Sequence, residues 1–514
     1  MFKKYQKLQN GSDIRGVSLT GVPGEPLSLR EDEAKTIAIG FVIWLTEKLG
    51  KKPEELVLAI GRDPRTSGPR LLDGLMDGFG LYGCRVYDFD LASTPAMFMA
   101  TVFPEFKCDG TVMITASHLP YNRNGFKFFT ADGGLNKKDI TAILEYAADR
   151  DVQLAKLGEP PMEGKQVHRL GKLVFEAEKA DIMTPYCRHL RELIIKGADN
   201  GERPLEGMKI TVDAGNGGGG FFATRVLKPL GADISASQFL EPDGMFEHHA
   251  PNPEDREAMN AISMQTVISG SDLGLIFDTD VDRSAAVDSR GREIARNGIV
   301  AMAAALVAEE HPGTTVVTDS ITSRQLTEFL EKELGLKHLR FKRGYRNVIN
   351  KAIELNREGI DCQLAIETSG HAALKENYFL DDGAYLATKI VIKAAKLHAR
   401  GLKIDSVIEK LENPADEKEI RIPITCADFG EYGDRVLEEL EAFAKAEEGM
   451  SLEEPNYEGV RINFTGKARG WCLLRKSLHD PLLPMNIASD DRGGCAAIER
   501  IMRDFLGRYS ELEL

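Results

Sequence analysis

Four apolar stretches of the chain end abruptly in loops of polar and charged residues. Each stretch is typical of a buried β-strand, and together they cover residues 109–114, 272–277, 361–366 and 470–474. In α/β proteins the loops at strand ends commonly carry the side chains that bind and transform ligands. The pattern therefore predicts four candidate site loops, which begin at Thr115, Asp278, Glu367 and Arg475.

Helical periodicity alternates with strands through about the first 400 residues. Ser28 to Glu31 resembles a capping box that opens an amphipathic helix, which Gly50 ends. Further elements are expected as a strand at 56–60, a helix at 67–82, a helix near 180–195 and a strand at 209–212. The polar segment 151–172 is a candidate link between two domains.

The last hundred residues change character. Strands are predicted at 420–424, 459–464 and 471–474, with helices around 432–446 and 495–506. This mixture indicates a small α+β domain. A chain of 514 residues exceeds one hydrophobic core, and its length suggests three or four domains.

Charge and cysteine usage narrow the functional classes. A net charge of −15 argues against general binding to nucleic acid or to an anionic membrane. The seven cysteines form no CxxC pair, which favours a reducing cytosol and gives no sign of a zinc knuckle. No apolar signal core follows the first residues, and the apolar runs are too short to span a bilayer. We therefore expect a cytoplasmic protein that acts on a small molecule.

The loop from Asp278 to Arg283 is the strongest local signal. Asp278, Asp280 and Asp282 alternate along it, and such carboxylates converge on a hard cation with oxygen ligands. An EF-hand is excluded because it requires glycine at the sixth position and glutamate at the twelfth. Mg²⁺ is favoured over Ca²⁺ if a phosphate oxygen completes the shell, and a solvated acidic turn is the alternative.

The other three loops are weaker taken singly. Ser117 is a candidate nucleophile or phosphoryl carrier, with His118 and Lys127 nearby in sequence. Glu367, Ser369 and His371 suit sugar hydroxyls and proton transfer, while Arg475 and Ser477 suit a phosphate. In each case an ordinary polar turn is the simpler alternative. For Arg15 and Arg62, the simpler alternative is a structural ion pair.

In order along the chain, these motifs resemble the α-D-phosphohexomutases, most closely the phosphomannomutase/phosphoglucomutase branch. The likeness runs over nearly the whole chain. It rests on the segments 13–16, 61–68, 115–118, 124–127, 213–217, 242–253, 278–283, 369–371, 375–376, 381–383 and 475–477.

The resemblance implies an α/β fold around a central cleft: three similar α/β domains with mixed sheets, and a smaller C-terminal α+β domain. The expected domains are 1–172, 173–291, 292–410 and 411–514. Ser117 corresponds to the phosphorylated serine, which shares a Mg²⁺ with Asp278, Asp280 and Asp282. The remaining counterparts are Arg15, Glu367, Ser369, Arg475 and Ser477 for substrate, and His118, Lys127, Arg283 and His371 for catalysis.

The implied reaction moves a phosphoryl group between O1 and O6 of glucose or mannose phosphate, with hexose 1,6-bisphosphate as primer. This sequence departs from the family pattern at Leu119, Thr279, Val281, Ile366, Leu478 and His479, and in the variable segment 342–346. Three alternatives stay open: a phosphoglucosamine mutase, a non-catalytic sugar-phosphate-binding protein on the same scaffold, and a metal-dependent phosphatase. The sequence leaves the preferred hexose and the oligomeric state undecided.

Overall fold

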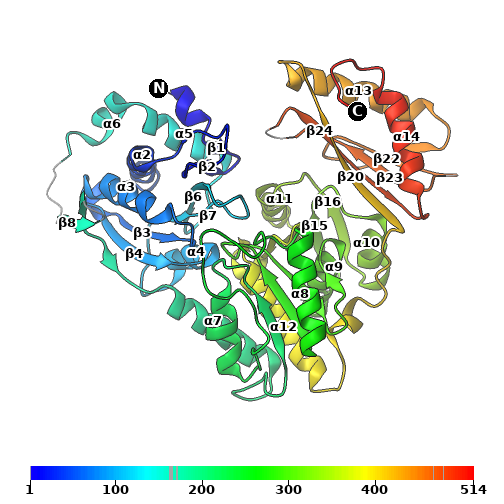
Figure 1. Ribbon diagram of the computed structural model, residues 1–514, viewed down its shortest axis with the longest axis horizontal. Helices are drawn as coiled ribbons and strands as arrows, with labels where there is room; N and C mark the ends of the chain where they lie inside the picture. Colours follow the sequence, from blue (N-terminus) through cyan, green and yellow to red (C-terminus); the bar gives the residue numbers. More distant parts are fainter. Residues whose placement is uncertain (1, 161–165, 170–171, 467, 478–479) are drawn as a thin grey trace. The chain divides into compact units, whose positions relative to one another are not determined.

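The computed structural model describes residues 2–160, 166–169, 172–466, 468–477 and 480–514 (Figure 1). Contacts divide the chain into two compact units. Unit 1 comprises Met1–Ile299 and Ser369–Val407, and unit 2 comprises Val300–Thr368 and Ile408–Leu514. The domain boundaries expected at residues 172, 291 and 410 stay predictions. Among the described residues, no helix combines the length and the apolar character that crossing a membrane requires.

Unit 1 begins with a mixed sheet in the strand order β1-β2-β6-β5-β3-β4-β10, in which β7 pairs with β6. Strands β3, β4, β5 and β10 are parallel, whereas β1, β2 and β6 join by antiparallel pairing. The strands are β1 (Gln9–Asn10), β2 (Asp13–Val17), β3 (Val57–Arg62), β4 (Arg85–Leu91), β5 (Gly110–Ile114), β6 (Arg123–Thr130), β7 (Gly133–Gly134) and β10 (Glu178–Lys179). The helices of this part are α1 (Phe2–Gln6), α2 (Glu31–Leu49), α3 (Gly68–Gly80), α4 (Thr94–Val102), α5 (Lys137–Ala148) and α6 (Arg150–Leu157).

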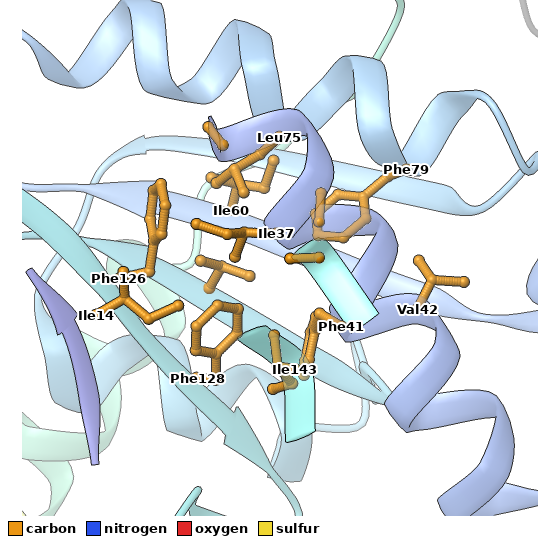
Figure 2. Close-up of a cluster of buried hydrophobic side chains, with 14 of the residues drawn as sticks. Ile14, Ile37, Phe41, Val42, Ile60, Leu75, Phe79, Phe126, Phe128 and Ile143 are labelled. Atoms are coloured by element: carbon orange, nitrogen blue, oxygen red, sulfur yellow. The ribbon is translucent and has the colours of Figure 1, made fainter. Parts of the chain in front are cut away.

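Alternation along β5 explains how the two faces of this sheet are covered. Val112 and Ile114 join the apolar cluster that α2, α3 and α5 form on one face, around Phe41 and Phe79 (Figure 2). Thr111, the residue before Val112, points to the opposite face, where its hydroxyl donates to the Met97 carbonyl of α4 over 2.9 Å. Burial on both faces fixes the register of β5, and so the position of the loop that follows it.

The start of α2 differs from the expected capping box at Ser28. The helix begins at Glu31, and the Glu33 carboxylate accepts the backbone N–H of Arg30 over 3.0 Å. The Ser28 hydroxyl instead accepts the N–H of Val17 in β2. The Ser28 side chain, which the local sequence assigned to the helix cap, therefore bonds to a residue of β2 instead.

The segment 151–172, expected to be a link, contains regular structure. Helix α6 continues to Leu157, and β8 (Gln166–Arg169) pairs with β9 (Lys172–Phe175). Residues 161–165 and 170–171 of this segment lie outside the described residues.

The second sheet of unit 1 has the order β11-β12-β13-β14, from β11 (Ile210–Asp213), β12 (Leu273–Phe277), β13 (Ser284–Asp288) and β14 (Glu293–Ile294). Antiparallel pairing of β12 with β13 places Phe277 opposite Ser284, so residues 278–283 form the turn of a hairpin. Helices α8 (Arg256–Ser269) and α12 (Gly383–His398) pack on these strands, and α7 (Met183–Ala198) packs on α12. The short strands β18 (Ala372–Leu374) and β19 (Leu380–Asp381) also belong to unit 1.

Unit 2 contains a parallel group of β16, β15 and β17 and a separate antiparallel sheet in the order β20-β24-β23-β22-β21. Its strands are β15 (Thr315–Thr318), β16 (Lys337–Arg340), β17 (Cys362–Ile366), β20 (Asp416–Pro423), β21 (Met450–Leu452), β22 (Val460–Phe464), β23 (Gly470–Leu474) and β24 (Leu482–Ser489). Its helices are α9 (Asn297–Glu310), which starts in unit 1, α10 (Arg324–Glu328), α11 (Tyr345–Arg357), α13 (Phe429–Ala446) and α14 (Gly494–Leu506).

The expected fold class is confirmed: three mixed α/β sheets and a C-terminal antiparallel sheet. All four apolar stretches are strands, namely β5, β12, β17 and β23. Strand β24, an interior strand of the last sheet between β20 and β23, was not predicted, because Pro484 interrupts its pattern.

Candidate functional site

Three aspartates in the hairpin turn form a buried cluster of oxygen ligands. Asp278, Asp280 and Asp282 each offer one carboxylate oxygen, and these atoms lie within 4.8 Å of one another. All three side chains are at most 1% exposed. One oxygen of Asp280 and one of Asp282 are buried and accept no hydrogen bond from any residue that the structure describes. A donor set of oxygens with unsatisfied lone pairs fits a hard divalent cation such as Mg²⁺.

The charges of this cluster interact strongly. Burial and the neighbouring Asp282 and Asp280 carboxylates raise the pKa of Asp278 well above its usual value. Burial alone would also raise the pKa of Asp282, but Lys127, His371 and Arg283 outweigh it and hold that pKa far below its usual range. The cluster is therefore electrostatically costly unless cations compensate it.

Ser117 lies against this cluster. Its hydroxyl donates to Asp278 Oδ2 over 3.0 Å and is 3.3 Å from His118 Nδ1. The residue is only 7% exposed, and its backbone has a φ of 50°, a left-handed conformation that is uncommon outside glycine. The turn after β5 thus aims a serine oxygen from the first sheet at the carboxylates of the second.

A buried arginine organises the Ser117 loop. The guanidinium of Arg65 is fully buried and donates to the backbone carbonyls of residues 117, 119, 120 and 123. Asp63 accepts from Arg65 Nε over 3.0 Å and from the Thr115 hydroxyl over 2.8 Å. Thr115 in turn accepts the N–H of Ser117. These bonds hold the loop in its strained conformation and satisfy its carbonyls, of which that of Ser117 is buried.

Two cations from different elements compensate the aspartates. Lys127 in β6 contacts Asp282 and lies 3.4 Å from Asp280 Oδ2. Arg283 donates through Nε to Asp278 over 3.2 Å and through Nη1 to Asn252 Oδ1 over 3.2 Å. Its Nη2 is buried without a partner among the described residues, which leaves a donor for an anionic ligand.

His371 forms a buried pair with Asp381. The distance from His371 Nδ1 to Asp381 Oδ2 is 2.6 Å, and Asp282 Oδ1 lies 3.8 Å from the same nitrogen. Burial by itself would lower the pKa of His371, but the Asp381 and Asp282 carboxylates outweigh it and raise the pKa to about 9. The imidazole therefore carries a proton at neutral pH and is suited to donate it.

Three further predicted residues lie in unit 1. Arg15 in β2 bonds to the Thr115 carbonyl and to Asp13 over 2.8 Å, so it braces the strand end before Ser117. His118 is exposed next to Ser117. Ser369 is 7% exposed, and its hydroxyl is buried without a hydrogen-bond partner among the described residues.

Glu367, Arg475 and Ser477 lie in unit 2. Glu367 Oε1 accepts the N–H of Gly344 over 2.6 Å, which ties it to the variable segment 342–346. Arg475 is 8% exposed, and its Nε has no partner among the described residues. The Ser477 hydroxyl accepts the N–H of Asp480. Leu478 and His479 lie outside the described residues.

The structure explains one departure from the family pattern. Val281 has a φ of 68°, a conformation in which a β-branched residue is rare and glycine is common. Its carbonyl accepts the N–H of Gly383 over 3.1 Å, and its side chain is fully buried. Packing therefore holds valine where glycine would be unstrained, and the three aspartates of the turn still bring ligand atoms within 4.8 Å of one another.

Sequence reasoning missed several residues that shape this cluster: Arg65, Asp63, Thr94, Asn252 and Asp381. Each contacts a site residue or a residue of a site loop that is far away in the sequence or belongs to another element. Asp63, Asn252 and Asp381 had a signal, since each lies in a motif that carried the resemblance. The others read as turn or capping residues when taken alone.

Family models and curated relatives match most of the chain. Models of phosphoglucomutase/phosphomannomutase alpha/beta/alpha domains I, II and III match residues 6–154, 184–291 and 296–413. A phosphoglucomutase of Neisseria meningitidis is 30% identical over 495 residues, 96% of this chain and 95% of the relative. A phosphomannomutase/phosphoglucomutase of Pseudomonas putida is 28% identical over 485 residues, 93% of this chain and 94% of the relative.

A solved structure shares the fold over nearly the full length. A phosphoglucomutase/phosphomannomutase family protein of Burkholderia thailandensis superposes with a TM-score of 0.76 at 24% identity. The match covers 98% of this chain and 97% of that one.

Proposed function

Because the chain belongs to the phosphoglucomutase/phosphomannomutase family, whose members are phosphohexomutases, we propose that it interconverts the 1- and 6-phosphates of glucose or mannose. The observation that carries this proposal is the contact between Ser117 Oγ and Asp278 over 3.0 Å inside a buried carboxylate cluster. A phosphoryl carrier beside a cation site is what reversible phosphoryl transfer requires.

Phosphorylated Ser117 donates its phosphoryl group to the free hydroxyl of the sugar phosphate. The bond from phosphorus to Ser117 Oγ breaks, a bond to the sugar oxygen forms, and the sugar becomes a 1,6-bisphosphate. After the sugar has reoriented, its other phosphate returns to Ser117. Hexose 1,6-bisphosphate therefore serves as the primer that phosphorylates a resting protein.

The aspartates of the hairpin turn, together with the Ser117 phosphoryl group, would hold Mg²⁺. When bound, this ion neutralises charge on the transferring phosphoryl oxygens. Arg283 supplies a second positive group through Nη2, which has no partner within the described part of the chain. Lys127 neutralises Asp280 and Asp282 from the other side. The chemistry consists mainly of alignment and charge compensation.

His371 is the proposed proton carrier at the sugar oxygen, with His118 next to Ser117 and Lys127 as the other candidate groups. Protonated His371 donates when the phosphoryl group returns to Ser117, and the neutral form accepts the hydroxyl proton in the opposite direction. Asp381 stabilises the protonated form through its 2.6 Å contact.

An Asp381→Asn variant tests this role. Removing the carboxylate lowers the pKa of His371, so the loss of activity at high pH begins at lower pH, by on the order of 1 pH unit. The measurements are kcat/KM from pH 6 to 10 and an NMR titration of His371. Asp132→Asn removes an exposed carboxylate and serves as the control. An unchanged basic limb would show that His371 does not carry the proton.

Substrate recognition is proposed for five further residues. Glu367 and Ser369 hold sugar hydroxyls, and Arg475 and Ser477 hold the phosphate that is not transferred. Arg15 supports the Ser117 loop and supplies positive charge. The hydrogen bond from the Gly344 backbone to Glu367 supports a role for the variable segment 342–346 in sugar preference, because it couples the position of that segment to the position of Glu367.

A coupled assay tests the function. We expect conversion of glucose 1-phosphate and mannose 1-phosphate to their 6-phosphates, with dependence on Mg²⁺ and stimulation by glucose 1,6-bisphosphate. Exclusive turnover of glucosamine 1-phosphate would instead identify a phosphoglucosamine mutase. Release of inorganic phosphate without isomer exchange would identify a phosphatase, and binding without turnover would identify a non-catalytic sugar-phosphate-binding protein.

A further inference from the structure

The first turn of α4 contacts the proposed cation site from the outside. Thr94 is the first residue of this helix and is 3% exposed. Its backbone N–H donates to the Asp280 carbonyl over 2.8 Å, and its hydroxyl donates to Asp280 Oδ2. Thr94 of α4 thus binds both the main-chain carbonyl and the side-chain carboxylate of Asp280 in the hairpin turn.

This contact places the two carboxylate oxygens of Asp280 in different environments. Oδ2 is engaged by Thr94 and lies 3.4 Å from the Lys127 ammonium. Oδ1 is buried without a partner among the described residues. A carboxylate that is bonded on one oxygen cannot rotate freely, so its other oxygen stays available at a defined position.

The local structure makes Thr94 a rigid anchor. The Ser93 hydroxyl caps α4 by accepting the N–H of Ala96, and Pro95 fixes the backbone of the first turn. The following residues 96–101 are all buried. The hydroxyl of Thr94 is therefore placed by the packing of the helix rather than by the flexibility of a loop.

We propose that Thr94 is a positioning residue for the divalent cation: it orients Asp280 for ligation and makes cation affinity depend on α4. The inference rests on the proposed function only through the cation site. Direct cation binding is therefore the readout, so that a failure of this inference can be told apart from a failure of the mutase assignment.

The test uses the full-length, dephosphorylated protein and Mn²⁺ as the probe, with bound and free ion measured by electron paramagnetic resonance and Mg²⁺ added as competitor. Thr94→Val keeps the shape of the side chain and removes the hydroxyl. We expect the Kd for Mn²⁺ to rise about 10-fold or more, the usual effect of losing a group that orients a metal ligand. Thr94→Ser keeps the hydroxyl and is expected to bind within about 3-fold of the wild type.

Thr101→Val is the matched control. Thr101 lies in the same helix and is 8% exposed, but its hydroxyl donates to the Phe98 carbonyl within α4. Its Kd should stay within about 3-fold of the wild type. If Thr94→Val fails to fold, as judged by thermal melting, the comparison passes to Thr94→Ser and Thr94→Ala, which differ only in the hydroxyl. Equal Mn²⁺ affinity within the usable pair would overturn the inference. An absence of Mn²⁺ binding by the wild type would overturn both the inference and the cation site.

Discussion

Replacement of Ser117 by alanine is expected to lower sugar-phosphate isomerisation by roughly 10³-fold or more, because the chain then has no oxygen to carry the phosphoryl group. The fold should be retained, since alanine meets about the same backbone cost as serine at a φ of 50°. Binding of glucose 1-phosphate should also be retained, because the proposed phosphate and sugar contacts lie on other residues. The measurements are the coupled assay, calorimetric titration with the sugar phosphate and thermal melting.

Ser263→Ala provides the control for the loss of a hydroxyl. The Ser263 hydroxyl is buried in α8 without a hydrogen-bond partner among the described residues, so its removal breaks no contact. We expect this variant to isomerise sugar phosphates at the wild-type rate. Full activity of the Ser117→Ala protein would rule out a phosphoserine in the reaction.

Asp280→Asn should abolish the response to Mg²⁺ and, at the same time, stabilise the metal-free protein. Asparagine can keep the bond to Thr94 through its oxygen, and its amide nitrogen then takes the position of Oδ1, which bonds to none of the described residues. The change removes one of the buried charges that raise the pKa of Asp278. We expect the metal-free melting temperature to rise by a few degrees, on the order of 1 kcal/mol. Turnover should fall by about 100-fold or more, as expected when a metal ligand is lost.

Thermal melting with EDTA and with Mg²⁺ separates these effects. In the wild type, Mg²⁺ at about 100 times its Kd adds roughly 2.7 kcal/mol to the free energy of unfolding, whereas Asp280→Asn should gain nothing. A variant that melted lower than the wild type in EDTA would show that repulsion among the aspartates does not limit the stability of the metal-free fold.

Above about pH 4, where the stabilisation from the lowered pKa of Asp282 is already complete, the same cluster predicts the sign of the pH dependence of the metal-free protein. The folded-state pKa of Asp278 lies above its unfolded value, so the group stabilises the fold at low pH, and this contribution is lost as the pH rises through the folded value. The raised pKa of His371 acts in the same direction, since its contribution is lost as the pH rises towards about 9. Asp280→Asn should flatten this decline, because it brings the pKa of Asp278 closer to its unfolded value.

The local pattern of apolar residues was sufficient to predict the strands that end at the site. The apolar runs before Thr115 and Asp278 are buried on both faces, so each can be recognised as a strand without knowledge of the strand it pairs with. The alternation of the three aspartates was equally readable, and the structure brings their oxygens together as expected. These features depend on residues that are close in the sequence.

Contacts between segments that are distant in the sequence could not be predicted from the sequence alone. Arg65 binds the carbonyls of a loop more than fifty residues away, and Thr94 meets Asp280 across 186 positions. The same limit explains Ser28, whose hydroxyl bonds to β2 rather than capping α2. A single sequence shows which side chains have chemistry to offer, whereas tertiary packing decides which partner each one meets.

The phosphorylation state of one serine tests the central claim most directly. The full-length protein is incubated with glucose 1,6-bisphosphate and Mg²⁺, digested and analysed by peptide mass spectrometry. We predict one added phosphate on the peptide that contains Ser117, fragmentation that places it on Ser117, and its loss after excess glucose 1-phosphate is added. A fully active protein whose Ser117 remains unmodified throughout would contradict the account.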